Sequence, residues 1–218
     1  ASQLRALVAE VSEASASDDT ADLHSRCVSL LERLPSQLTI SELLFVDLFS
    51  GCGGRVLGYV QDSDEWNGVA VEADSDCCRV HAANLPSVSV LQHRINPGTP
   101  LPINLPVSVQ SGTVAVCSMG PPCQPFSTAG AGRGADDSRD GFPGALEAVR
   151  RLRPLMVEIE TVLNLTKFTD VFEGITRSLA DMGYHVRVHR VDFSQYGVPQ
   201  GRKRLLITAC CMGEPPFP

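Results

Sequence analysis

The sequence lacks the features that mark membrane and secreted proteins. No stretch approaches the ~18 unbroken apolar residues of a membrane-spanning helix. The segment from Ala1 to Ser17 mixes Arg, Glu and Ser, whereas a signal peptide needs a basic start and an apolar centre. These absences predict a soluble, intracellular protein with no membrane partner.

Cysteine is present, but the patterns that would give it a structural role are missing. The cysteines form no C-x-x-C pair and the histidines do not cluster with them, so a zinc site is disfavoured and we expect no metal. In a single intracellular domain, reduced thiols are expected rather than a disulfide framework. The eight cysteines lie at positions 27, 52, 77, 78, 117, 123, 210 and 211.

An excess of positive charge is also absent. The formal net charge is -7 and the isoelectric point is near 5.2. A nucleic-acid-binding domain usually carries a basic face, so the overall charge argues against that kind of partner. Basic residues nevertheless gather at Arg150 to Arg153 and at Arg202 to Arg204. The sequence is therefore still compatible with a local basic cleft.

What the sequence does contain is a regular alternation of strand and helix patterns. Its 218 residues, 43% hydrophobic and 20% charged, suit one globular α/β domain. Strands separated by helices imply right-handed crossovers and a sheet covered on both faces. We therefore predict a doubly wound, mostly parallel seven-stranded sheet, whose last two strands are antiparallel because no helix joins them. The sheet belongs to a lobe of residues 42–218, and residues 1–41 form an N-terminal helical appendage. The predicted strands are Leu43 to Leu48, Gly68 to Glu72, Val88 to Leu91, Thr113 to Cys117, Leu155 to Glu160, His185 to Val191 and Leu205 to Cys210; predicted helices include Ser75 to Asn84, Gly144 to Arg151 and Asp170 to Met182.

A glycine turn follows the first predicted strand. Gly51 and Gly53 let the backbone turn sharply and approach a ligand. A dinucleotide fingerprint would need glycine at position 56, which is Val56, so pyrophosphate binding is disfavoured. Glu72 ends the next strand about 20 residues on, where a carboxylate can accept both ribose hydroxyls. The pattern favours an adenosine ligand with a small charged tail; the alternative is an ordinary tight strand-to-helix connection.

The segment Met119 to Ser127 follows an apolar run that reads as a buried strand. Pro121 and Pro122 fix the backbone φ at two successive positions before Cys123. The sulfur is thereby held at the carboxyl end of the strand, where open α/β sheets place their ligands. We interpret Cys123 as a nucleophile, against the alternative that it is a small buried hydrophobic residue.

Ionic partners occur at two further strand ends. Glu160 closes the apolar run from Leu155, and therefore belongs to the same rim as Cys123. Arg202 and Arg204 alternate with a lysine, so both guanidinium groups share one face and can hold a carboxylate, a phosphate or a base oxygen. The alternative for Glu160 is a carboxylate that is solvated or paired with an arginine. The alternative for Arg202 and Arg204 is that they are ordinary basic residues at the start of a strand.

These pieces, in this order, resemble the DNA (cytosine-5)-methyltransferase family. The resemblance covers roughly Leu43 to Pro218 and rests on four blocks. They are FVDLFSGCGG at 45–54, GPPCQPFS at 120–127, ETVLNL at 160–165 and YGVPQGRKR at 196–204.

The resemblance implies a class I S-adenosylmethionine-dependent methyltransferase fold and assigns roles to residues. Cys123 would attack C6 of a cytosine flipped out of double-stranded DNA, Glu160 would engage N3 and the amino group, and the methyl group would pass to C5, leaving S-adenosylhomocysteine. Arg202 and Arg204 would position the base and the catalytic loop, of which Gly130 to Asp140 would be part. The implied cofactor-binding residues are Phe49, Gly51, Gly53, Glu72, Ile95 and Pro122, and the implied substrate-binding residues are Gln124, Ser127 and Thr161.

Departures from the family pattern keep two alternatives open. The family usually has Glu-Asn-Val where this chain has Thr161 after Glu160, and an Asp where it has Arg94-Ile95-Asn96. These changes favour, as one alternative, a catalytically impaired methyltransferase-like regulatory or binding protein. A tRNA cytosine-5 methyltransferase is the other, because the tRNA-directed relatives also carry PPCQPF. The fungal branch linked to repeat-induced silencing departs from Glu-Asn-Val too, in a different pattern.

The resemblance also bears on what lies around the lobe. The family continues into a target-recognition region and a final helix, which we do not find before Pro218. We interpret the chain as a catalytic-lobe fragment, or as a chain whose remainder or partner chain supplies target recognition. The expected location is the nucleus, with a role in epigenetic silencing, if the source is eukaryotic, and the cytoplasm otherwise.

Overall fold

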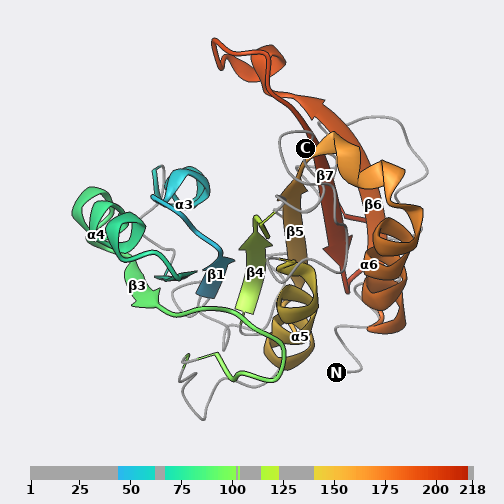
Figure 1. Cartoon of the computed structure of the whole chain (residues 1–218), viewed down its shortest axis with the longest axis horizontal. Coiled ribbons are helices and arrows are strands. Elements are labelled where there is room, and N and C mark those ends of the chain that lie inside the picture. The colour runs from blue at the N-terminus through green and yellow to red at the C-terminus, as the bar shows by residue number, and fades with distance from the viewer. Residues whose placement is uncertain (1–43, 62–66, 102, 104–113, 123–139, 216–218) are drawn as a thin grey trace, which may run out of the picture.

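The described part of the chain builds one seven-stranded sheet in the order β3-β2-β1-β4-β5-β7-β6 (Figure 1). The computed structural model describes residues 44–61, 67–101, 103, 114–122 and 140–215. The strands are β1 (Leu44–Leu48), β2 (Asn67–Glu72), β3 (Ser89–Gln92), β4 (Val114–Met119), β5 (Met156–Thr161), β6 (His185–Asp192) and β7 (Lys203–Cys210). The helices are α3 (Gly54–Val60), α4 (Ser75–Asn84), α5 (Phe142–Leu152) and α6 (Thr169–Asp181), with 3-10 turns η3 (Leu163–Lys167) and η4 (Phe193–Tyr196).

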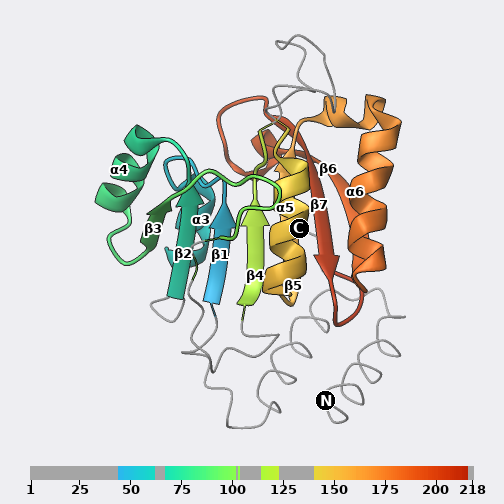
Figure 2. The ribbon, with the colours of Figure 1, turned by 60° about the horizontal axis from the view of Figure 1, so that its bottom comes forward.

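The predicted sheet is confirmed, including its antiparallel end. β1 to β5 pair in parallel, whereas β7 runs antiparallel to both β5 and β6. Figure 2 shows the arrow of β7 pointing opposite to those of β1, β2 and β4. The sequence did not predict that β7 lies between β5 and β6, because that choice of neighbours depends on tertiary pairing and not on local pattern.

Local signals explain where two of the helices begin and end. The Asp74 side chain accepts hydrogen bonds from the backbone N–H groups of Asp76 and Cys77, both at 2.9 Å, and so caps α4, whose predicted bounds are confirmed. α5 carries a proline in its first turn and ends at Leu152, and the next residue, Arg153, adopts the left-handed conformation with φ 49°. Pro154 follows and prevents the helix from continuing.

Two hydrophobic clusters cover the two faces of the sheet. The larger packs α5 and α6 against alternate residues of the central strands, among them Leu48, Val157 and Ile159. The smaller packs Val56 of α3 and Leu85, which follows α4, against the other face. In Figure 2, α5 lies in front of the sheet. Within the described ranges, no helix combines the length and apolar character needed to cross a membrane.

Candidate functional site

The carboxyl ends of the parallel strands bring most of the described candidate residues to one edge of the sheet. β1 ends before the turn that contains Phe49 and Gly51, and β2 ends at Glu72. β4 leads to Pro122, and Glu160 is the second-last residue of β5. Since β1 is bonded to both β2 and β4, and β4 to β5, these four strand ends are neighbours.

The turn after β1 requires glycine at one position and leaves space at another. Gly53 has φ 93°, and a Cβ there would lie 2.9 Å from Cδ2 of His81 in α4. Gly51 has φ 55°, and a Cβ there would meet nothing within 4 Å. Phe49 adopts φ 55° although it is not glycine. The turn is therefore packed tightly against α4 on one side and open at Gly51.

Glu72 ties the end of β2 to this turn. Its Oε2 accepts the backbone N–H of Gly51 at 2.8 Å. Its Oε1 accepts the N–H groups of Ala73 and Asp74 at 2.7 and 2.8 Å. Hydrogen bonds to an ionised carboxylate are stronger than neutral ones, so the predicted ribose acid and the predicted glycine turn form one hydrogen-bonded unit.

Phe49 and Pro122 meet at the start of α5. A Cβ on Gly141, the residue before α5, would lie 2.6 Å from Cδ of Pro122 and 3.2 Å from Cζ of Phe49. Both residues are partly buried. Two predicted cofactor residues from different strands thus form one apolar wall beside the glycine turn.

Ile95, another predicted cofactor residue, contributes to the core. It is buried, and its Cγ2 lies 3.1 Å from the position of a Cβ on Gly144 in α5. The preceding segment runs beside the acid of β2, because the N–H of His93 donates to the carbonyl of Glu72 at 2.7 Å. The cofactor role of Ile95 stays a prediction.

Two arginines hold the carboxylate of Glu160. Nη2 of Arg202 and Nε of Arg204 each lie 2.9 Å from its Oε1. The Glu160 side chain retains 20% of its exposure, so the pair is only partly shielded from water. Among the described residues none bonds to Oε2, which leaves this oxygen to accept a hydrogen bond from a ligand.

Thr161 lies on the other face of β5 from Glu160. It is 2% exposed and belongs to the row of Val157 and Ile159. Its Oγ1 has no hydrogen-bond partner among the described residues. The predicted substrate-binding role of Thr161 is untested, and its side chain lies in the core.

The sequence did not predict a buried polar cluster beneath the turn. Asp47 is fully buried in β1 and accepts from Nε of Arg55 at 3.0 Å and from Oγ of Ser118 at 2.5 Å. Burial raises the pKa of the Asp47 carboxyl, although the Arg55 charge opposes this shift. Tyr59 donates to Oε2 of Glu158 at 2.6 Å, and its pKa is raised by burial and by that carboxylate. The one signal available was an acid inside the apolar run Phe45 to Phe49.

Several predicted features lie outside the described residues. These are the nucleophile Cys123, the substrate residues Gln124 and Ser127, nearly all of the predicted loop Gly130 to Asp140, and the appendage of residues 1–41. The description of the nucleophile turn ends at Pro122, one residue before the cysteine. The segment that leads from β4 toward the cysteine is held beside the end of β1, because the N–H of Gly120 donates to the carbonyl of Leu48 at 3.3 Å.

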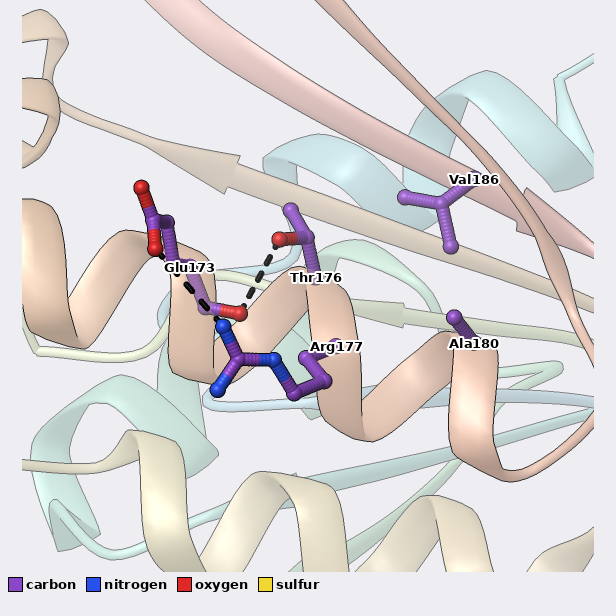
Figure 3. Close-up of a pocket in the computed structure, with 5 residues that line it drawn as sticks. All are labelled: Glu173, Thr176, Arg177, Ala180 and Val186. Atoms are coloured by element: carbon purple, nitrogen blue, oxygen red, sulfur yellow. Dashed lines mark hydrogen bonds and ion pairs between the residues drawn. The ribbon is translucent and has the colours of Figure 1, made fainter.

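A pocket elsewhere on the molecule contains none of the predicted site residues. Figure 3 shows it between α6 and β6. One ion pair crosses part of it, between Arg177 and Glu173 at 3.7 Å. The residues that line it are Glu173, Thr176, Arg177, Ala180 and Val186. It offers no grouping of catalytic side chains comparable to the strand ends.

Fold and site together define the class of protein. The strand order, with the antiparallel β7 between β5 and β6, confirms the predicted fold of class I S-adenosylmethionine-dependent methyltransferases, and the glycine turn and Glu72 lie where that fold was predicted to place its cofactor site. Within that class the chain belongs to the C-5 cytosine-specific DNA methylase family, whose family model matches residues 43–215. The family predicted from the four sequence blocks is confirmed, while the likeness to its fungal branch stays a prediction.

Individual relatives and a solved structure agree with this assignment. Type II methyltransferase M.AplI of Arthrospira platensis is 34% identical over 170 residues, which are 78% of this chain and 46% of that protein. Type II methyltransferase M.AquIA of a Picosynechococcus strain is 30% identical over 184 residues, covering 79% of this chain and 74% of that protein. A candidate DNA modification methyltransferase encoded within a prophage (E. coli) matches with a TM-score of 0.60 at 25% identity, over 77% of this chain and 46% of that chain. The chain thus spans less than half the length of M.AplI.

Proposed function

We propose that the protein carrying this chain methylates C5 of cytosine in double-stranded DNA, using S-adenosylmethionine. The observation that carries the proposal is the carboxylate of Glu160, held on one oxygen by Arg202 and Arg204 at the sheet edge that Pro122 also reaches. An acid fixed in this way can bind the N3 and amino edge of a cytosine. The family assignment supplies the reaction class.

The glycine turn and its surroundings fit the cofactor. The space in front of Gly51 is open, and the carboxylate of Glu72 lies within hydrogen-bond distance of the Gly51 N–H. Phe49 and Pro122 provide an apolar wall beside it. These residues would hold S-adenosylmethionine, which when bound supplies a methyl group on a positively charged sulfur.

In the proposed reaction, Cys123 acts as the nucleophile. Its thiolate adds to C6 of cytosine, and the electron pair of the 5,6 double bond moves to C5. C5 would then take the methyl group from the cofactor sulfur, which would leave as S-adenosylhomocysteine. A base then removes the C5 proton, the double bond re-forms and the thiolate leaves. Because a free thiol with a pKa of ~8.5 is only slightly ionised at neutral pH, nearby cationic groups would favour the reactive form.

Glu160 would act on the opposite side of the ring. A proton or hydrogen bond shared with N3 stabilises the negative charge that builds up after the thiolate adds. With Oε1 already bonded to two arginines, Oε2 is the oxygen available for this contact. The target base is out of reach inside the stack, so it would be flipped out at a cost of a few kcal/mol.

We further infer a cytoplasmic location and a DNA partner, on the basis of the bacterial relatives. M.AplI and M.AquIA both come from bacteria, and both are Type II methyltransferases. Because the chain spans 46% of M.AplI, we assign target recognition to a further region or a partner chain around the lobe of residues 42–218. A nuclear location and a role in epigenetic silencing would apply only to a eukaryotic source.

Trapping of the covalent intermediate tests the proposal. DNA that contains 5-fluorocytosine has no removable C5 proton, so the wild-type protein and cofactor should form a stable adduct with it. The Cys123→Ser variant should form none, and Cys211→Ser, which changes an exposed thiol beyond β7, should form it normally. A wild-type protein that binds cofactor and DNA but gives no adduct would overturn the mechanism.

One observation favours a second candidate, a methyltransferase-like protein that has lost turnover. Thr161 stands where the family usually has asparagine, and no residue in the described part of the chain bonds to its buried hydroxyl. Calorimetric titration separates the two functions together with the adduct assay. A protein that binds the cofactor and forms the adduct is the enzyme. A protein that binds DNA, but neither binds the cofactor nor forms the adduct, is the regulatory or binding protein.

A further inference from the structure

A row of polar residues crosses three central strands beneath α3. The strand registers pair Asp47 of β1 with Ser118 of β4, and Ser118 with Glu158 of β5. All three side chains therefore lie on the same face of the sheet. Asp47 and Ser118 are fully buried, so this row needs polar partners from the element that covers it.

α3 supplies those partners from one face of the helix. Arg55 and Tyr59 are four residues apart, which places them one above the other. Nε of Arg55 lies 3.0 Å from Oδ1 of Asp47, and the Tyr59 hydroxyl lies 2.6 Å from Oε2 of Glu158. The two contacts fix the rotation of α3 about its axis, and α3 begins directly after the glycine turn.

Arg55 also contacts the turn itself. Its Nη2 donates to the carbonyl of Leu48 at 3.1 Å and to that of Phe49 at 3.0 Å. Phe49 is held at φ 55°, a left-handed conformation that is unfavourable for a non-glycine residue. A guanidinium that binds both carbonyls stabilises that conformation, and with it the orientation of the Phe49 ring.

The same guanidinium touches the turn that leads to the nucleophile. A Cβ on Gly120 would lie 2.3 Å from Nη1 of Arg55. Gly120 in turn donates its N–H to the carbonyl of Leu48 at 3.3 Å. Glycine at position 120 is thus what lets Arg55 lie between the end of β1 and the end of β4.

We propose that Arg55 is a positioning residue. It fixes the glycine turn after β1 relative to the turn at Gly120 after β4, and so forms the cofactor site. The inference rests on the proposed function, because it takes S-adenosylmethionine as the ligand of that turn. For its proposed role Arg55 requires no contact with the reacting groups. It acts through the carbonyls of Leu48 and Phe49 and through the space at Gly120.

The alternative is that Arg55 only stabilises the fold by neutralising Asp47. Two variants separate these roles. Arg55→Lys keeps the positive charge but not the planar set of donors that reaches Asp47 and both carbonyls. Tyr59→Phe is the matched control, since it removes a hydrogen bond from the same face of α3 without touching either turn.

The experiment measures the dissociation constant for S-adenosylmethionine by calorimetry and the midpoint of thermal unfolding, for each variant of the full-length protein. We expect Arg55→Lys to bind the cofactor at least about tenfold more weakly, because it loses hydrogen bonds from a charged donor. Tyr59→Phe should lower the unfolding midpoint but bind within about twofold of the wild type. Equal cofactor binding by the wild type and Arg55→Lys would overturn the role of Arg55 alone. A wild type that binds no cofactor would overturn the proposed function and this inference together.

A second pair of variants covers the case in which Arg55→Lys does not fold. Gly120→Ala should displace the guanidinium without changing any charge, and should weaken cofactor binding in the same direction. Adding Arg55→Met to Gly120→Ala removes the clash, so the two substitutions should be strongly non-additive in stability. Independent effects of the two substitutions, with cofactor binding unchanged in Gly120→Ala, would contradict the proposal.

Discussion

Nε of Arg204 lies 2.9 Å from Oε1 of Glu160, and a second guanidinium, from Arg202, reaches the same oxygen. Glu160→Gln keeps the shape of the side chain but removes its charge. We expect the turnover rate for methyl transfer to fall about 10²–10⁴-fold, the range typical for loss of an acid-base group. Cofactor affinity should be unchanged.

The matched control for Glu160→Gln is Glu173→Gln, an exposed carboxylate of α6 on the far side of the sheet from Glu160. It should retain the wild-type turnover rate. If Glu160→Gln also turned over at that rate, Glu160 would have only the structural role of pairing with the arginines.

Glu72 is the residue whose loss should affect cofactor affinity most directly. In either orientation of its amide, Glu72→Gln places an NH₂ group against a backbone N–H that now bonds to the carboxylate, that of Gly51 at Oε2 or those of Ala73 and Asp74 at Oε1. We expect the cofactor dissociation constant to rise about 10–100-fold, the equivalent of one or two charge-assisted hydrogen bonds. Asp76→Asn, an exposed position in the first turn of α4, is the calorimetric control and should bind normally.

Two glycine substitutions should have opposite effects on stability. A Cβ on Gly68 in β2 would lie 2.0 Å from Cζ of the buried Phe45, so Gly68→Ala should destabilise the fold by roughly 1–3 kcal/mol or more. A Cβ on Gly58 in α3 would meet nothing within 4 Å, so Gly58→Ala should stabilise the helix by about 0.5–1 kcal/mol. Urea unfolding of both variants measures the two free energies, and changes of the same sign would contradict this packing.

Thr161 allows a test of burial against a substrate role. Thr161→Val replaces an unpartnered buried hydroxyl by a methyl group of the same shape. We expect the free energy of unfolding to increase by about 1–3 kcal/mol, because the cost of desolvating the hydroxyl disappears. Chemical unfolding measures this change. If Thr161→Val transferred methyl groups to DNA more slowly while binding the cofactor normally, the substrate-binding role of Thr161 would be supported.

The sequence predicted the parts of the site that depend on chain order. Gly51, Glu72 and Glu160 each follow from a strand pattern and the residue that ends it, and parallel strands bring such ends to one edge. The predicted bounds of α4, Ser75 to Asn84, are also those of the structure, in which the Asp74 side chain caps the start of the helix. No distant contact was needed for these predictions.

The parts that escaped prediction depend on pairing between distant segments. Asp47 and Ser118 meet across 71 positions of sequence, and only the register of β1 against β4 brings them together. Arg55 then reaches the turn because the face of α3 that carries it packs over Asp47 and Ser118. The burial of Thr161 likewise depends on α5 and α6 packing against the face of β5 that carries Val157 and Ile159, whereas the motif gives only its place beside Glu160.

The position of β7 also has a consequence for how the protein folds as it is made. β5 and β6 do not bond to one another, and each pairs instead with β7. At synthesis rates of about 5–20 residues per second, both strands leave the ribosome before Lys203 to Cys210 and must wait for their common neighbour. During that interval β6 and the edge of β5 that faces away from β4 have no strand partner, and such unpaired edges are open to aggregation or chaperone capture until β7 emerges.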